Sequence, residues 1–493
     1  MLKTTTEEQD AAGTGGAELT PAARRALAGL SLSMLLPSLA TSIANVGLPA
    51  LARAFSASFQ EVQWVVLAYL LAITTMIVGA GRLGDIVGRR RLLLAGICLF
   101  TAASLLCGVA PALWLLVAAR AAQGLGAAVM MALTVALVSE TVPKARAGSA
   151  MGLLGTMSAA GTTLGPGLGG LLIAGLGWRT IFLVNVPLGV LNFLLARRHL
   201  PSDRREAEAD GAGFDKAGTL LLALTLAAYA LAMTVGRGRP GPLNVALLSC
   251  AVVGVGLFAL AEGRAPSPLV RLAMFRDPAL SAGLAMSALV STVMMATLVV
   301  GPFYLSRALG LETALVGLAL SAGPLVAALA GVPAGRVVDR FGARRTTVVG
   351  LVGMAGGSSV LSAMPSRLGV AGYVAPVVVV TAAYALFQAA NNTAVTAGVR
   401  PDRRGVVSGL LGLSRNLGLV TGASVMGAVF ALASAALDIT TARPEAVAAG
   451  MRVTFAVAAV LIVVALAVAV GTYRRTSRDG VIKRAPALGG CAP

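Results

Sequence analysis

Charged residues are scarce in this chain. Asp, Glu, Lys and Arg make up 12% of its 493 residues, whereas hydrophobic residues make up 57% and the mean hydropathy is +0.86. Because soluble domains carry about 25% charged residues, this composition excludes an ordinary soluble protein. Its uncharged stretches are long enough to cross a bilayer, which needs about 20 residues each. Residues 1–25 are polar, mixed in charge and without a signal-peptide pattern, which predicts a disordered cytoplasmic tail.

Cysteine, histidine and aromatic residues are also rare, and each shortage excludes a class of function. The four cysteines show no metal or disulfide spacing and His199 is the single histidine, so we expect no metal site and no cofactor. Aromatic residues make up 4%, too few for a nucleic-acid surface despite the net charge of +19. No Walker sequence occurs, and "GAGFD" (211–215) follows no strand, which argues against a nucleotide-dependent pump or enzyme.

The apolar stretches number fourteen, and the basic residues between them indicate their orientation. An even number places both termini on one side of the membrane. The basic runs "GRRR" (88–91), "RFGARR" (340–345) and "RPDRR" (400–404) fall on that side, whereas the opposite loops hold isolated arginines. The positive-inside rule therefore predicts that both termini are cytoplasmic. Because lipid cannot satisfy open backbone groups, the sequence predicts an all-α polytopic membrane protein with 14 transmembrane helices.

Two patterns recur along the chain at nearly the same interval. The loop "GRLGDIVGRRR" (81–91) returns as "GRVVDRFGARR" (335–345), 254 residues later, and five of the seven glycines of "GLLGTMSAAGTTLGPGLGG" (152–170) return 257 residues later. The recurring loop residues are Gly81, Arg82, Asp85 and Gly88, which match Gly335, Arg336, Asp339 and Gly342. The chain is therefore predicted to be a duplication of six helices, and parallel repeats of this kind are typical of alternating-access transporters.

This duplication predicts the organisation of the whole chain. The predicted parts are a cytoplasmic tail (1–25), an N-terminal six-helix bundle (26–196), a cytoplasmic linker (197–216), two inserted helices (217–262), a cytoplasmic loop (263–278), a C-terminal six-helix bundle (279–473) and a cytoplasmic tail (474–493). The substrate site is expected between the two bundles, with the inserted helices at the periphery.

These motifs resemble those of the major facilitator superfamily and, within it, the fourteen-helix drug:proton antiporters. "GRLGDIVGRRR" is similar to the superfamily's loop between helices 2 and 3, and "RAAQGLGAA" (120–128) to its fourth-helix motif. "GLLGTMSAAGTTLGPGLGG" resembles the antiporter motif of helix 5. "VQWVVLAYLLA" (62–72) and "GWRTIFLVNVPLG" (177–189) resemble signatures of the fourteen-helix exporters. The resemblance implies a multidrug exporter of the bacterial cytoplasmic membrane, driven by the proton gradient.

Three sets of candidate residues follow. The repeated loops, with Arg89 and Arg90, are expected to act as gates, because a carboxylate at Asp85 or Asp339 can pair with arginine or a helix N-terminus in one state only. A solvated turn is the alternative. The antiporter motif supplies Gly152, Gly161, Gly165, Pro166, Gly169 and Gly170. Gly161, Gly165 and Gly169 form one smooth face for a neighbouring helix, and Pro166 favours a kink.

The third set is expected at a coupling site or substrate cavity. Arg120 and Arg415 lie inside apolar spans, where an arginine is costly and therefore functional by default; snorkelling of Arg120 and anchoring by Arg415 are the alternatives. The remaining candidates are Gln123, Asn45, Trp64, Tyr69, Gln388, Asn391 and Asn392. Hydrogen bonding between helices is the alternative for the amides.

Acidic residues are absent from the middle of every predicted span. The family's first helix usually carries an aspartate before a threonine, and Ala40 stands there in "LATSIANVGLP" (39–49). Two buried arginines without a buried acid favour neutral or anionic substrates, whereas the family resemblance favours cations. The sequence thus predicts a proton-coupled antiporter of small amphipathic compounds. The alternatives are a transporter of one specific metabolite, anionic ones included, and a non-transporting membrane sensor. The expected partners are a small molecule, protons and lipid, with no nucleic acid and no obligate protein partner.

Overall fold

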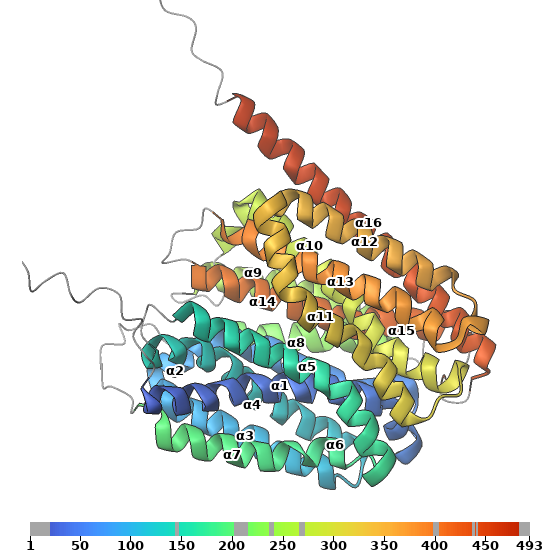
Figure 1. The fold of residues 1–493 in the computed structure, drawn as a ribbon, viewed down its shortest axis with the longest axis horizontal. Helices are drawn as coiled ribbons and strands as arrows, with labels where there is room; N and C mark the ends of the chain where they lie inside the picture. Colours follow the sequence, from blue (N-terminus) through green and yellow to red (C-terminus); the bar gives the residue numbers. More distant parts are fainter. Residues whose placement is uncertain are drawn as a thin grey trace, which may run out of the picture.

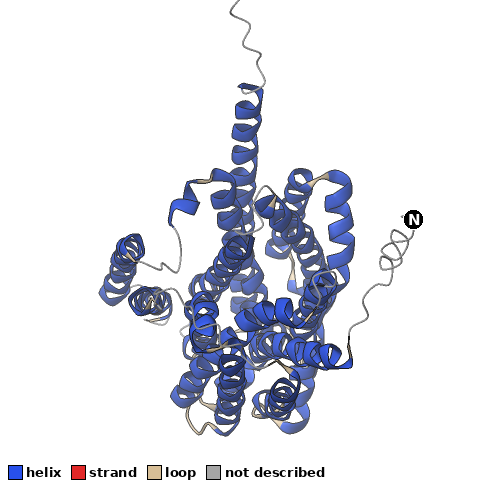
Figure 2. Cartoon of the chain, turned by 90° about the vertical axis from the view of Figure 1, so that its left-hand side faces the viewer, coloured by secondary structure: helices blue, strands red, loops and turns tan. Residues whose placement is uncertain are grey.

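The computed structural model describes residues 20–142, 147–201, 215–235, 241–265, 272–397, 404–435, 439 and 442–482. Every regular element within these ranges is helical, as Figures 1 and 2 show. Fourteen of the described segments are long and apolar enough to cross a membrane. This confirms the predicted fold class, an all-α polytopic membrane protein with fourteen spans.

The first group of helices forms around α1. Its elements are α1 (Pro21–Ala54), α2 (Phe59–Val87), α3 (Arg89–Val109), α4 (Leu113–Thr141), α5 (Ala147–Leu176), α6 (Thr180–Leu183) and α7 (Asn185–His199). Helix α1 packs against α5, α4 and α7, while α4 packs against α2 and α3. The sixth predicted span is broken between α6 and α7, which together make one span.

The second group repeats this arrangement around α10. Its elements are α10 (Pro278–Phe303), the π-helical turn η3 (Tyr304–Ala308), α11 (Thr313–Phe341), α12 (Ala343–Ala363), α13 (Gly369–Thr396), α14 (Arg404–Thr421), the π-helical turn η6 (Gly422–Met426), α15 (Gly427–Ala433) and α16 (Pro444–Ile482). Short 3-10 turns, η2 (Leu272–Arg276) and η4 (Ser366–Leu368), precede α10 and α13. Helices α5 and α11 form the largest contact between the groups, and α2 with α14 forms a second.

The inserted helices are α8 (Lys216–Thr234) and α9 (Pro242–Arg264), which pack mainly on each other. Helix α8 also touches α2 and η6, so it contacts both groups. The indole Nε1 of Trp64 on α2 donates to Thr234 Oγ1 on α8 at 3.2 Å. Helix α9 is mostly exposed along its apolar length, which suits a surface covered by lipid.

Two helix ends differ from the predicted boundaries. Helix α1 begins at Pro21 inside the predicted tail, because Thr20 caps it by accepting from the backbone N–H of Ala23 and Pro21 suits the first helical position. Helix α16 continues to Ile482, beyond the predicted end of the last span. The rest of both tails, residues 202–214 of the linker and residues 266–271 of the loop lie outside the described residues.

The two repeated loops make the same turn. Helix α2 ends and α3 begins at Gly88, whose φ is 104°, and α11 ends and α12 begins at Gly342, whose φ is 82°. Residues with a side chain rarely adopt positive φ, so glycine fits both positions. We call the end of the molecule that holds these turns the basic end, and the end where α1 meets α2 the far end.

The glycines of the duplicated stretch bring two pairs of helices close together. A Cβ on Gly165 would lie 1.9 Å from Ser42 Oγ on α1, and Ser42 donates to the Gly161 carbonyl at 3.1 Å. In the second group a Cβ on Gly418 would lie 2.3 Å from the Ala288 carbonyl on α10, and Thr292 donates to the Gly418 carbonyl at 3.1 Å. The repeat therefore preserves both the close approach and the hydrogen bond across it. Helix α5 continues through Pro166 without a break.

Candidate functional site

A central cavity of about 230 Å³ lies between the two groups of helices. Ser38, Thr41 and Ser158 contribute from the first group, and Thr381 and Arg415 from the second. The other lining residues are Pro37, Ser42, Leu70, Ile73, Met131, Thr162, Met294, Met295, Thr297, Leu298, Leu320, Gly323, Pro324, Ala327, Tyr373, Val377, Tyr384, Asn416 and Leu419. Because both groups supply the wall, relative movement of the groups would change the cavity.

Arg415 is the only charged side chain among the described residues that line this cavity. It lies on α14, half-buried, beside the buried Asn416. Among the described residues no hydrogen bond or ion pair to its guanidinium is found. The hydroxyl groups on the first group's wall already have partners. Ser38 and Ser158 bond to each other at 2.7 Å, and Thr41 donates to the Pro37 carbonyl, so this wall is only weakly polar. The cavity is therefore amphipathic with one positive charge.

A second space of about 360 Å³, the polar chamber, adjoins the cavity within the second group. Arg415 and Tyr384 line both spaces. The other lining residues of the polar chamber are Ser287, Ser291, Phe387, Gln388, Asn391, Asn392, Thr393, Thr396, Leu411 and Gly412. Since Thr396 ends α13 at the basic end, the chamber runs from that end toward Arg415. The structure thus brings Arg415, Gln388, Asn391 and Asn392 to the wall of the polar chamber, and none of the three amides lines the described central cavity. The Asn391 amide donates to the Gly283 carbonyl of α10 at 3.1 Å, a hydrogen bond between helices of the kind given as the alternative.

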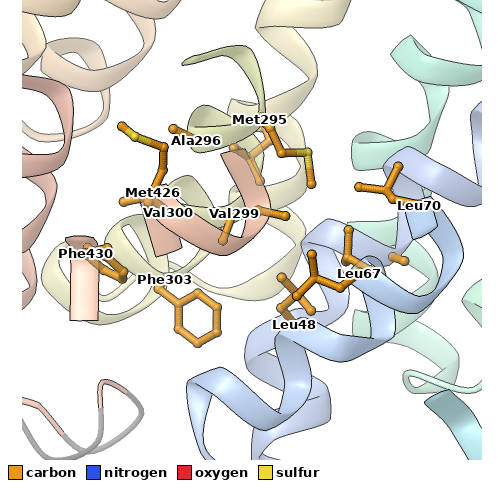
Figure 3. Packing of buried hydrophobic residues seen from close by; sticks show 14 of the residues in the cluster. Leu48, Leu67, Leu70, Met295, Ala296, Val299, Val300, Phe303, Met426 and Phe430 are labelled. Carbon is orange, nitrogen blue, oxygen red and sulfur yellow. The ribbon is translucent and has the colours of Figure 1, made fainter. Parts of the chain in front are cut away.

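Aromatic and aliphatic side chains close the far end between the groups. The ring of Phe59 on α2 makes edge contacts with Phe303 on α10 and Phe430 on α15, with centroids 4.9 Å and 5.6 Å apart. In Figure 3, Leu48 and Leu67 face Val299 and Phe303 across this contact. Beyond it a separate hollow, lined by Arg53, Arg307 and Glu312 among others, opens at the far end.

Backbone contacts strengthen this closure in both halves of the repeat. A Cβ on Gly170 of α5 would lie 2.9 Å from Gly317 Cα of α11, and Thr163 donates to the Pro324 carbonyl at 2.9 Å. On the other side, the Gln63 amide of α2 donates to the Ala423 carbonyl of η6. Gln63 is not among the residues predicted for the site, although it lies in "VQWVVLAYLLA" (62–72), a segment that carries the family resemblance.

The basic ends of the same helices have no comparable contact. A Cβ built on Gly152 or Gly155 of α5, or on Gly331 or Gly335 of α11, would meet no atom within 4 Å. The close glycine contact of α5 with α11 is therefore found toward the far end, and the polar chamber reaches toward the opposite end.

Arg120 lies in the core of the first group and outside the described wall of the cavity. Its Nε donates to the Val65 carbonyl at 2.9 Å and its Nη1 to Gln123 Oε1 at 2.5 Å, while Gln123 donates to Ser104 at 2.7 Å. Its guanidinium lies 4.1 Å from the ring centroid of Tyr69, an arrangement typical of a cation–π contact. The snorkelling alternative is not what the structure shows, since the side chain is fully buried.

The remaining candidates for the cavity also lie elsewhere. Tyr69 donates its hydroxyl to the Pro37 carbonyl, Asn45 donates to the Thr41 carbonyl, and Trp64 bonds to α8. Tyr69 and Trp64 thus join α2 to α1 and to α8, whereas the Asn45 bond lies within α1. Among the aromatic residues, Tyr384 and Tyr373 line the cavity, and the sequence did not single out Tyr373.

The described contacts of the first repeated loop lie within the first group of helices. Asp85 accepts from Arg89 at 2.8 Å within the first loop, and Arg90 donates to the Arg197 carbonyl at 2.5 Å. Asp339 of the second loop is exposed. A role of these loops as gates therefore stays a prediction.

The sequence and fold both match known proteins. The Major Facilitator Superfamily model matches residues 30–423 and 283–487. The multidrug resistance protein Stp of Mycobacterium tuberculosis (strain H37Rv) is 33% identical over 82% of this chain and 74% of its own length. The drug efflux pump JefA of the same strain is 31% identical over 84% of this chain and 81% of its length.

A solved structure shows the same fold. A bacterial homolog of the human lysosomal transporter Spinster, in an inward-facing and unoccupied conformation, superposes with a TM-score of 0.66 at 17% identity, over 94% of this chain and 99% of that one. Fold and relatives indicate a multi-pass membrane transporter. The chain therefore belongs to the Major Facilitator Superfamily, and within it to the drug-efflux proteins.

Proposed function

We propose that the protein is a proton-coupled secondary active exporter of small amphipathic compounds, in the cytoplasmic membrane of a bacterium with both termini in the cytoplasm. The observation that carries this proposal is the cavity lined by both repeat-related groups and sealed toward one end. A pair of bundles with two discrete packings can open alternately to each side. The similarity to the drug efflux pump JefA supports export, and the similarity to the multidrug resistance protein Stp fits a role in drug tolerance.

The lining of the cavity supports an amphipathic substrate. Met294, Met295, Leu298 and Leu419 offer an apolar surface that adapts to shape, since methionine is unbranched and polarisable. Hydroxyl groups on the opposite wall and Arg415 supply polar contacts. Binding pockets for small molecules combine an apolar wall with a few polar groups in this way.

Transport into inverted vesicles tests the proposal. An imposed pH gradient, acidic inside, should drive accumulation of an amphipathic dye, and a potassium-diffusion potential alone should drive less. Gly323 lines the cavity, so Gly323→Leu should block accumulation, whereas Gly356→Leu on the exposed face of α12 is the matched control. Accumulation that ignores the pH gradient for every compound tried would overturn proton antiport.

A second candidate is transport of one specific metabolite. The single charge of Arg415 in the cavity favours this reading when the metabolite is anionic. Saturable transport of one compound, with unchanged drug tolerance after deletion of the gene, would support it over multidrug export.

A further inference from the structure

The walls of the two adjoining spaces change from polar to apolar along α13 and α10. On α13, Asn392 and Gln388 line the polar chamber and Thr381 and Val377 line the central cavity, with Tyr384 between them in both walls. Helix α10 changes from Ser287 and Ser291 in the chamber to Met294, Met295 and Leu298 in the cavity. Helix α14 supplies Leu411 and Gly412 to the chamber and Asn416 and Leu419 to the cavity, and it shows no such change. The path is therefore polar toward the basic end and apolar in the centre.

Arg415 stands where this change occurs. It belongs to both walls and carries the only charge in either of them among the described residues. Within the described residues the side chains of Arg415, Gln388 and Asn392 make no hydrogen bond, and Arg415 lies within electrostatic range of Tyr384. The guanidinium and the two primary amides therefore offer several N–H donors to the polar chamber.

The position in the first group that matches Arg415 differs in its hydrogen bonding. Arg415 corresponds to Ser158 in the duplicated stretch, and Ser158 is bonded to Ser38 at 2.7 Å. The first group thus satisfies its own polar side chain there, whereas the second group places there a cation that makes no hydrogen bond or ion pair within the described residues. The other buried arginine, Arg120, is held by Val65 and Gln123 inside its own group. The unpaired donors are consequently confined to one side of the cavity.

We propose that the central cavity and the polar chamber together bind amphipathic organic anions, with the anionic group on Arg415. This inference rests on the proposed transport function and names its substrate class. A carboxylate, sulfonate or phosphate accepts paired hydrogen bonds from a guanidinium, and the amides of Gln388 and Asn392 supply further donors on the polar side. The apolar body of the substrate lies along Met294, Leu298 and Leu419. A cationic substrate would be repelled by Arg415, and no carboxylate lines either described wall to attract it.

Binding to the purified full-length protein in detergent tests this without requiring transport. The probes are carboxyfluorescein and rhodamine 123, which share a xanthene ring system and carry opposite charge. Fluorescence anisotropy should show that carboxyfluorescein binds and that rhodamine 123 binds at least about tenfold more weakly, as expected for one charge-assisted hydrogen-bonded contact.

Variants of the charged position supply the decisive comparison. Arg415→Gln should weaken carboxyfluorescein binding about tenfold or more, while Arg415→Lys, which keeps the charge but not the planar fork, should lose less. Arg367→Gln removes the same charge from an exposed turn at the far end and should change nothing. Melting temperatures of all variants establish that each one folds, and Gln388→Leu provides a second test on the amide side.

The outcomes separate the two proposals. Tighter binding of rhodamine 123 than of carboxyfluorescein, no binding of carboxyfluorescein, or unchanged binding in a folded Arg415→Gln would overturn the anion site. Failure of gradient-driven accumulation in vesicles together with Arg415-dependent binding would instead overturn proton coupling and leave the anion site standing.

Discussion

The side-chain amide of Gln63 donates to the backbone carbonyl of Ala423 and so joins α2 of the first group to η6 of the second. Ala423 stands at the position that Pro166 holds in the other copy of the repeat. There the Pro166 carbonyl comes close to Gly317 of α11. The same carbonyl of each copy therefore lies at a contact between the groups, although one contact is a hydrogen bond and the other is close packing.

Removal of the Gln63 amide should loosen the far end. Gln63→Leu keeps the size of the side chain but loses a hydrogen bond worth about 1 kcal/mol, which shifts the balance between open and closed far ends about fivefold. The reporter is Val299→Cys in a chain without its four native cysteines, because Val299 is fully buried in this closure. Maleimide labelling of that cysteine should quicken in the Gln63→Leu background. Equal labelling rates in both backgrounds would contradict a role in the closure.

Bulk at Gly170 should prevent the far end from closing. A Cβ there would already lie 2.9 Å from both Gly317 Cα and the Thr313 carbonyl, so Gly170→Leu cannot be accommodated in this packing of α5 against α11. We expect loss of transport and rapid labelling at Val299→Cys. Gly175→Leu, one turn along α5 where a Cβ meets nothing within 4 Å, is the control and should transport normally. Normal transport by Gly170→Leu would show that this contact is dispensable.

The sequence predicted the helix packing better than the cavity, for a physical reason. Glycines repeated every fourth residue lie on one face of a helix. Because glycine has no side chain, another helix can approach that face closely. In the structure α1 and α10 are the helices that do so. An arginine inside a span must only avoid lipid. Arg120 avoids lipid by being buried inside its own group, and Arg415 avoids lipid by lining the cavity. No local sequence pattern distinguishes these two positions. The contacts that decide this come from helices far apart in the chain, such as α2 and α13.

The duplicated glycine faces should respond alike to added methyl groups. Gly165→Ala and Gly418→Ala insert a Cβ against α1 and α10 and should each cost about 1–3 kcal/mol of stability through overpacking. Gly155→Ala and Gly412→Ala face open space and should be neutral or stabilise by up to about 1 kcal/mol, since alanine favours helix. Thermal unfolding in detergent measures all four. A lower melting temperature for the second pair than for the first would contradict the packing argument.

Replacement of Arg120 should lower the stability of the first group of helices. Arg120→Met keeps most of the bulk but leaves Gln123 Oε1 without its donor in a dry core, which costs about 1–3 kcal/mol. The double variant Arg120→Met/Gln123→Leu removes both partners and should recover most of the lost stability. Transport by the stable double variant then tests the predicted role in coupling. We expect it to stay low; normal transport would restrict Arg120 to holding α4 against α2.

Asp85 should affect transport but not the stability of the state described here. Its ion pair with Arg89 is exposed and lies within one loop, so it contributes at most about 1 kcal/mol. Asp85→Asn should therefore leave the melting temperature unchanged. If the carboxylate engages the second group when the basic end closes, the same variant should slow transport severalfold, because the closed state loses a charge-assisted contact.

Asp339→Asn is the comparison from the other copy of the repeat. Because the Asp339 side chain is also exposed, we expect the same pattern of unchanged stability and slower transport. Wild-type transport rates in both variants would favour the alternative that these loops are solvated turns, whereas a lower melting temperature would indicate that the Asp85–Arg89 pair already stabilises this state.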